Sequence, residues 1–163
     1  MNTQKHTSAK TSVNMVPTLF RRAEFGKKNL DIGGGKYDTA SEWLQENHGC
    51  ENLVYDPYNR SEEHNDDVLA QAENLDTITI SNVLNVIKER KWRDMVLNMA
   101  AHHAGPATRV YITVYEGDRS GEGRETRCGY QLHRKTEAYV KEVKKFFKQV
   151  ERKGKLIIAS DPR

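Results

Sequence analysis

The sequence predicts an α/β protein with an open, mostly parallel sheet flanked by helices. Short apolar or β-branched runs alternate with helical patterns along the chain, which is the order that βαβ units produce. The first predicted strand continues directly into three consecutive glycines, Gly33 to Gly35, as the strand-to-helix turn at the ligand-binding edge of such a sheet does. The length of 163 residues suits one domain of this kind.

Local signals define the elements of the first half. Residues 29–32 form a short apolar run, and residues 39–47 have apolar side chains at helical spacing, with Gly49 as the expected C-cap. Residues 52–55 predict a second strand, which the Asp-Pro that follows must end because proline cannot continue a central strand. Residues 58–75 are acidic and are expected to be irregular, with at most a short strand or turn.

The second half continues the alternation and is expected to close with an antiparallel strand. Residues 76–86 begin with a β-branched run, as strands buried on both faces do. The other expected elements are, in order, a helix over 89–103, a strand over 109–115, a glycine- and arginine-rich loop over 116–130, an amphipathic helix over 136–149 and a hairpin over 150–160.

Residues 1–28 are expected to form an arm that packs on a single domain of residues 29–163. The arm is polar apart from an apolar patch, and a short helix is predicted around residues 17–24. The chain has neither a run of about 18 apolar residues nor an apolar signal segment at its start, so no membrane span and no secretion are predicted. Cys50 and Cys128 belong to no metal-ligand or disulfide pattern, which indicates no metal site and a reducing, cytoplasmic location.

The stretch from Asn29 to Asp38, NLDIGGGKYD, is the sharpest chemical signal in the sequence. A glycine turn at this point lets the backbone approach a ligand, which would be a dinucleotide or S-adenosylmethionine. A dinucleotide brings an anionic pyrophosphate and requires a third glycine where this chain has Asp38. S-adenosylmethionine instead brings a sulfonium and an ammonium group, which carboxylates such as Asp31 attract. The charges therefore favour S-adenosylmethionine, with a dinucleotide or a purely structural turn as the alternatives.

Two later carboxylates fit a nucleoside ligand. Asp56 ends the second predicted strand about 20 residues after the glycines, where a carboxylate can accept hydrogen bonds from both ribose hydroxyls. Asp67, beyond a short acidic segment, is expected to meet the adenine amino group. Dinucleotide enzymes use the same ribose contact, so Asp56 supports a nucleoside without choosing between the two ligands.

Three segments, LDIGGGKYD, LVYDPYNR and DTITISNVLNVI, resemble in order and spacing the first, second and fourth motifs of class I S-adenosylmethionine-dependent methyltransferases. The resemblance covers residues 29–87 and implies a Rossmann-like sheet with an antiparallel C-terminal strand, and S-adenosylmethionine as the cofactor. The DPY and NVLNVI segments, with the N-terminal HTSAKT, further resemble a methyltransferase-like group that occurs in phage genomes and beside DNA phosphorothioation genes.

The resemblance also implies a role for each residue at a motif position. Tyr37 departs from the pattern, because many members have a small residue there, so it either narrows the cofactor slot or turns outward. By position, the methionine part of the cofactor would contact Asp31, Gly33 and Gly35, and Gly34 and Tyr37 would also belong to the cofactor site. The ribose would contact Asp56, the adenine ring would be bordered by Tyr55 or Pro57, and its amino group would contact Asp67. Ser81 and Asn82 would face the reacting centre, with Ser81 also part of the cofactor site.

The methyl acceptor has no motif of its own in this sequence. Enzymes that methylate exocyclic amines of adenine or cytosine carry a Pro-Pro-aromatic segment where this chain has Ser81-Asn82-Val83-Leu84. A nucleic acid or a phosphorylated small molecule is the predicted acceptor, because phosphate contacts come mostly from Arg and Lys and the late loop carries Arg119, Arg124, Arg127, Arg134 and Lys135. The alternatives are solvated basic segments and a non-catalytic module that keeps the cofactor fold, such as a phage-encoded factor acting on a host protein. No pattern selects an oligomeric state.

Overall fold

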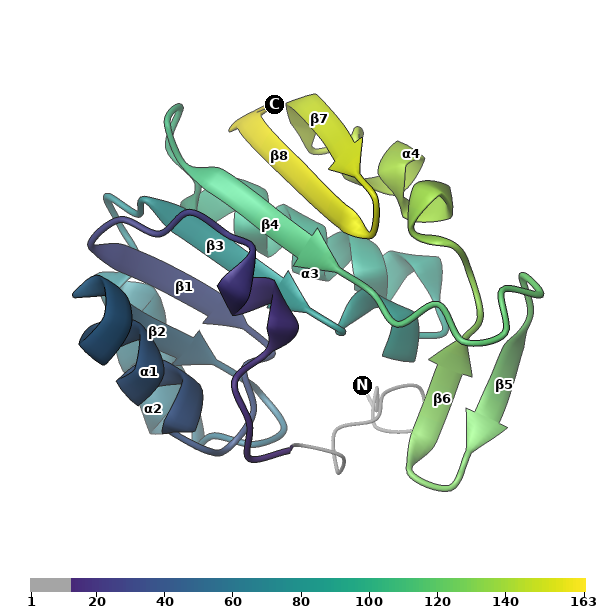
Figure 1. Cartoon of the computed structure of the whole chain (residues 1–163), viewed down its shortest axis with the longest axis horizontal. Coiled ribbons are helices and arrows are strands. Elements are labelled where there is room, and N and C mark those ends of the chain that lie inside the picture. Colours follow the sequence, from purple (N-terminus) through teal and green to yellow (C-terminus); the bar gives the residue numbers. More distant parts are fainter. Residues whose placement is uncertain (1–12) are drawn as a thin grey trace.

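The computed structural model describes residues 13–163, which contain one six-stranded sheet and one two-stranded hairpin (Figure 1). The strands of the large sheet are β1 (Lys28–Ile32), β2 (Glu51–Tyr55), β3 (Thr77–Ser81), β4 (Arg109–Thr113), β7 (Phe147–Lys153) and β8 (Leu156–Pro162).

The sheet has the order β2-β1-β3-β4-β8-β7, and its first four strands are parallel. β8 runs antiparallel to β4, and β7 pairs antiparallel with β8. The open, mostly parallel sheet with an antiparallel final strand is therefore confirmed. The chain moves from β1 outward to β2 and then returns to β3 on the other side of β1, so the sheet has a topological switch point between β1 and β3.

Helices cover both faces of the sheet. The α-helices are α1 (Thr39–His48), α2 (Glu62–Gln71), α3 (Arg90–His103) and α4 (Val140–Val143), and the 3₁₀ turns are η3 (Thr18–Arg21), η4 (Leu84–Val86) and η5 (Thr136–Tyr139). Figure 1 shows the arm with η3 in front of the sheet and α3 behind it. No helix among residues 13–163 is long and apolar enough to cross a membrane.

The alternation of side chains along each strand creates two cores. Leu30 and Ile78 point to the face covered by α2 and α3, where they join Leu97. Tyr111 and Leu156 point to the other face, where they pack with residues of η3 and α1 that include Leu19, Phe20 and Leu44. Because η3 contributes fully buried side chains, this part of the arm is built into the domain.

Four predicted elements differ from the structure. The segment expected to be irregular contains α2, which the Ser61 side chain caps by accepting the His64 amide hydrogen. The strand expected over 76–86 ends at Ser81, because Asn82 has a φ of 56°, which a strand cannot continue. The helix expected over 136–149 ends at Val143, since Phe147 already pairs with Pro162 as the start of β7.

The fourth difference is the loop expected over 116–130, which contains the hairpin of β5 (Gly123–Thr126) and β6 (Gly129–Leu132). Tyr130 and Leu132 of this hairpin join the core on the α3 face. The Asn85 amide of η4 also donates a hydrogen bond to the Gln131 side chain at 3.3 Å, so the hairpin is attached to the segment that follows β3.

Residues 1–12 of the predicted arm lie outside the described residues, and the division into an arm and a domain stays a prediction.

Candidate functional site

A cavity of about 750 Å³ lies at the carboxyl edge of the parallel strands, around the switch point between β1 and β3. Its lining comes from the turns after β1, β2 and β3, from the arm, and from η4 and α3. Volumes of this size are typical of small-molecule and cofactor sites. The fold therefore brings together segments that are far apart in sequence at the point where open α/β sheets bind ligands.

The glycine turn after β1 forms the floor of this cavity. Gly33 and Gly35 have φ values of 79° and 84°, which side chains other than glycine rarely adopt. The Gly33 amide donates to the Tyr55 carbonyl at 2.7 Å, which extends the β1–β2 ladder into the turn. A side chain at Gly34 would collide with the Asp31 carboxylate, so this glycine is required for close packing rather than for its φ.

The Asp56 carboxylate joins the turn after β1 to the turn after β2. Asp56 is 4% exposed, and its Oδ2 accepts the Gly35 amide hydrogen at 2.9 Å and an Asn59 side-chain hydrogen at 3.0 Å. Its Oδ1 accepts the amide hydrogens of Tyr58 at 3.0 Å and Asn59 at 3.1 Å. Four donors use the usual capacity of a carboxylate, so Asp56 connects both turns through its own side chain.

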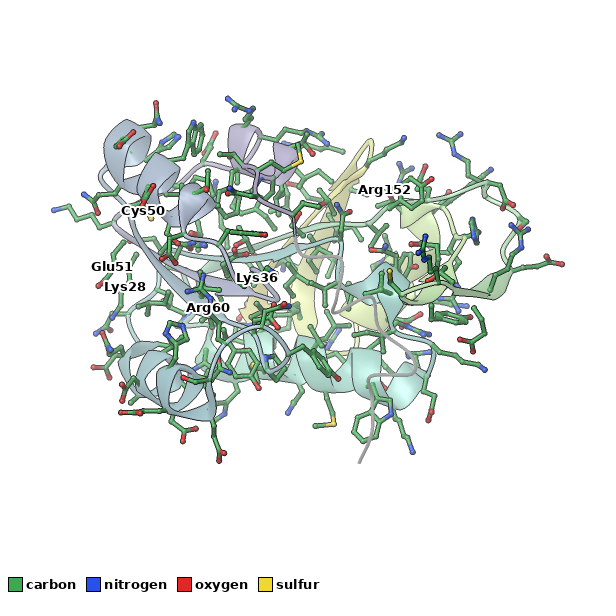
Figure 2. The ribbon with its side chains drawn as sticks, turned by 90° about the horizontal axis from the view of Figure 1, so that it is seen from below. Lys28, Lys36, Cys50, Glu51, Arg60 and Arg152 are labelled. Carbon is green, nitrogen blue, oxygen red and sulfur yellow. The ribbon has the colours of Figure 1, made fainter. Side chains whose placement is uncertain are left out.

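Arg60 clamps the outer side of the glycine turn. Its guanidinium donates from Nε to the Gly35 carbonyl at 2.8 Å, from Nη1 to the Asp38 carboxylate at 2.9 Å and from Nη2 to the Tyr37 carbonyl at 3.0 Å. Figure 2 shows Arg60 beside Lys36 at this end of the molecule, whereas Arg152 lies well away from them. The planar fork of arginine suits three acceptors on one short segment, which lysine could not replace.

Asp31 is the last member of a hydrogen-bonded chain of buried polar side chains beneath the glycine turn. Thr77 donates to Asn29, Asn29 donates to Thr79, and Thr79 donates to Asp31, at 2.7, 3.0 and 2.8 Å. Burial, together with the nearby Asp56 charge, raises the pKa of Asp31 to about 6, against the opposing effect of the Thr79 hydrogen bond. Asp31 therefore changes charge close to neutral pH.

The segment after β3 provides the opposite wall. Ser81 is the last residue of β3, and Asn82 adopts a left-handed conformation while its amide donates to the Thr113 carbonyl of β4 at 2.9 Å. Both residues line the cavity, as does Val83. The predicted reacting-centre residues therefore face the glycine turn across the same cavity.

Most of the predicted cofactor residues line this cavity. Tyr37 lies at its rim with 38% exposure, and Tyr55 and Pro57 line it beside Asp56. Burial raises the pKa of Tyr55, which keeps its phenol neutral. Asp67 is the exception, because it lies on the exposed side of α2 and does not line the cavity. The helix that replaces the expected loop carries Asp67 away from the site.

The basic residues of the late segment lie outside the cavity, and acidic neighbours pair with several of them. Arg119 is 3.0 Å from Glu116, Arg124 is 2.7 Å from Asp118, and Arg134 is 2.7 Å from Glu142. Arg127 and Lys135 are exposed. Among residues 13–163, no group of three His, Cys, Asp or Glu side chains could hold a metal ion.

Thr79, Asn59 and Arg60 have structural roles that no motif indicated. A signal for Thr79 was present, since Asn29 and Asp31 alternate with apolar residues as Thr77 and Thr79 do, which indicates polar side chains on one face of two neighbouring strands. The Asn59-Arg60 pair follows Asp56 directly, but only the folded turn shows that both side chains return to the glycines.

Comparison of the chain with protein-family models and with curated proteins finds no match. Solved structures do match it. The structure of PigF with SAH aligns with a TM-score of 0.61 and 15% identity over 94% of this chain and 64% of PigF. The sugar N-methyltransferase KedS8 from Streptoalloteichus sp ATCC 53650 aligns with a TM-score of 0.58 and 8% identity over 90% of this chain and 84% of KedS8.

The mitomycin 7-O-methyltransferase MmcR aligns with a TM-score of 0.55 and 15% identity over 86% of this chain. The chain spans about half the length of MmcR, 51%. The fold is that of the class I methyltransferases. In this class I fold the cavity occupies the switch point of the sheet. None of these structures supports the narrower resemblance to the phage and phosphorothioation-associated group.

Proposed function

We propose that the chain binds S-adenosylmethionine at the switch point and transfers its methyl group to an acceptor. The observation that carries the proposal is the charge of the cavity. Its charged lining residues are Asp31 and Asp56, and no Lys, Arg or His among residues 13–163 lines it. A cavity whose lining contains two buried carboxylates and no cation favours a ligand that is itself positively charged.

The residues present fit this cofactor, which supplies a methyl group activated by the positive sulfonium. Gly33 to Gly35 line the cavity where its methionine part would lie, and Asp31 in its ionised form attracts the ammonium group. The adenine ring would lie beside Pro57, which follows Asp56 in the chain and lines the same cavity.

The ribose requires one change in the observed hydrogen bonds. Three of the four donors to Asp56 are backbone amides, whereas the fourth is the Asn59 side chain, which can rotate away. A ribose hydroxyl would take the place of the Asn59 side chain on Oδ2. Asp56 then keeps the turns in place while it binds the nucleoside.

A dinucleotide fits the same cavity poorly. Its pyrophosphate would lie at the glycine turn against Asp31 and Asp56, and no cationic side chain of the described lining would offset that repulsion. The similar structures that name an activity are methyltransferases, which supports methyl transfer rather than hydride transfer.

The test for turnover is the formation of S-adenosylhomocysteine from methyl-labelled S-adenosylmethionine, with pooled small molecules, nucleic acids and proteins supplied in separate reactions. The proposal predicts label transfer to one pool and its loss in Asp56→Ala. Binding of the cofactor without transfer to any pool would instead favour the non-catalytic module.

The nucleic acid or phosphorylated acceptor expected from Arg119, Arg124, Arg127, Arg134 and Lys135 remains a second candidate for the acceptor. Such a molecule would have to be held outside the cavity, chiefly by the exposed Arg127 and Lys135. Oligonucleotide binding that weakens steeply with salt would support it, and binding that is absent or independent of salt would exclude it.

A further inference from the structure

We infer that the methyl acceptor is a small, uncharged and largely apolar molecule with a ring system; this inference rests on the proposed function. The part of the cavity beyond the glycine turn has two apolar walls on opposite faces of the sheet, and the acceptor would lie between them. These walls consist of Val13, Met15 and Val16 from the arm and Trp92, Met95 and Met99 from α3.

The two walls include large apolar side chains that the fold leaves exposed. Met15 and Met95 are more than half exposed, at 61% and 56%. Exposed apolar patches on the lining of a cavity mark binding sites, and methionine adapts its flexible side chain to ligands of different shapes. The residues proposed to hold the cofactor come from the ends of β1, β2 and β3 and the turns after them, whereas these methionines come from the arm and α3.

The arm wall is fixed to the domain. The Thr39 hydroxyl of α1 donates a hydrogen bond to Asn14, and the buried Leu19 and Phe20 anchor the segment that follows. The arm residues therefore lie over the carboxyl edge of the sheet as part of the cavity, while α3 approaches the same edge from behind (Figure 1).

The charges of the cavity argue against a phosphorylated acceptor inside it. A phosphate would lie near Asp31 and Asp56, and no described lining residue could neutralise it. During transfer, the acceptor lone pair forms the bond to the methyl carbon, and the carbon–sulfur bond breaks with its electron pair remaining on sulfur. The proton of the acceptor group then passes to water, so an uncharged acceptor needs no cationic side chain.

The test uses two probes with the same ring, 1-naphthol and 1-naphthyl phosphate, titrated into protein saturated with S-adenosylhomocysteine. We expect 1-naphthol to bind about tenfold more tightly or better than 1-naphthyl phosphate. Met95→Glu should weaken 1-naphthol binding about tenfold and leave S-adenosylhomocysteine binding unchanged. Asn98→Glu is the matched control, because it adds the same charge to an exposed position of α3 outside the cavity.

Equal or tighter binding of 1-naphthyl phosphate, or equal effects of the two glutamate variants, would overturn this inference and leave the proposed function intact. Displacement of 1-naphthol by a single-stranded DNA 12-mer would overturn it in favour of a nucleic acid acceptor. Failure of S-adenosylhomocysteine to bind, measured first by calorimetry, would overturn the proposed function and the inference with it.

Discussion

The Asp56 carboxylate accepts the Gly35 amide hydrogen at 2.9 Å, so the residue that ends β2 also holds the turn that follows β1. The same carboxylate receives three further hydrogen bonds from Tyr58 and Asn59. The glycine turn and the turn after β2 are therefore one hydrogen-bonded unit. A change at Asp56 should affect folding and ligand binding together.

Replacing Asp56 by alanine tests this unit. Asp56→Ala leaves the Gly35, Tyr58 and Asn59 amides without their acceptor, which should lower the free energy of unfolding by about 2–4 kcal/mol. The affinity for S-adenosylhomocysteine should fall at least about tenfold. Denaturant titration and calorimetry measure the two effects. Asp67→Ala, on the exposed side of α2, is the control and should change neither the stability nor the affinity. A loss of affinity in that variant would mean that Asp67 does contact the ligand.

Removing the Asn59 side chain separates its two contacts with Asp56. Asn59→Ala removes the side-chain donor to Oδ2 but keeps the backbone amide donor to Oδ1. If a ribose hydroxyl replaces that side chain, the affinity for S-adenosylhomocysteine should be equal to or greater than that of the unchanged chain. A calorimetric titration that shows a tenfold loss, by about 1.4 kcal/mol, would mean that Asn59 itself contacts the ligand.

Arg60 should position the glycine turn without touching the ligand. Arg60→Gln removes hydrogen bonds to the Gly35 and Tyr37 carbonyls, so the turn should loosen and the affinity for S-adenosylhomocysteine should fall about five- to twentyfold. The matched control is Arg152→Gln, which removes an exposed hydrogen bond to the Gly154 carbonyl far from the cavity. Equal affinities for S-adenosylhomocysteine in the two variants would mean that Arg60 does not position the turn for ligand binding.

Asp31 should make cofactor binding depend on pH. Its pKa is raised from 3.8 to about 6, and a positively charged ligand favours the ionised carboxylate. The affinity for S-adenosylmethionine should therefore rise between pH 5 and about 7 and then level off. Calorimetry across this range measures the change, and Asp31→Asn should bind weakly at every pH.

Ionisation of Asp31 should lower the stability of the fold, although it strengthens cofactor binding. A carboxyl whose pKa is higher in the folded chain stabilises the fold while it is protonated, so this contribution is complete below about pH 4 and is lost as the pH rises through 6. The loss is about 3 kcal/mol, and it should be absent from Asp31→Asn. Urea unfolding of both proteins at pH 4 and pH 8 measures it; parallel pH profiles would contradict the prediction.

Gly34 tests the close packing under the turn. A Cβ in Gly34→Ala would overlap the Asp31 carboxylate and approach Val54, so the variant should lose about 1–3 kcal/mol of stability and bind S-adenosylhomocysteine weakly. Gly105→Ala is a suitable control, because its Cβ would meet only the Thr108 hydroxyl at an ordinary distance of 3.7 Å. Thermal unfolding should therefore separate the two variants.

The sequence predicted the strands and the glycine turn because these features depend on local patterns. The run Thr77–Ser81 is β-branched with alternating polarity, and the glycines follow β1 without interruption. It could not predict α2, because only Asn65 and Val68 of that helix are buried and no apolar stripe appears. Because no helix was predicted there, Asp67 was expected to lie in a loop and to contact the adenine amino group.

In the C-terminal region, the sequence pattern predicted a longer helix than the structure contains. Val140, Val143, Phe146 and Phe147 have helical spacing, yet the helix stops at Val143 because the chain from Phe147 onward pairs with β8. Hydrogen bonds between distant residues decide this outcome, as they do for Arg60 and the glycine turn. Local periodicity in the sequence predicts neither the pairing of β7 with β8 nor the contacts of Arg60 with the glycine turn.

The most direct test of the central claim is calorimetric titration of the chain with S-adenosylmethionine and, separately, with NAD⁺ at pH 7.5. The account predicts one S-adenosylmethionine bound per chain, strong loss of this binding in Asp56→Ala, and no measurable binding of NAD⁺. Absence of S-adenosylmethionine binding, or preferential binding of NAD⁺, would contradict it and leave the glycine turn with a purely structural role.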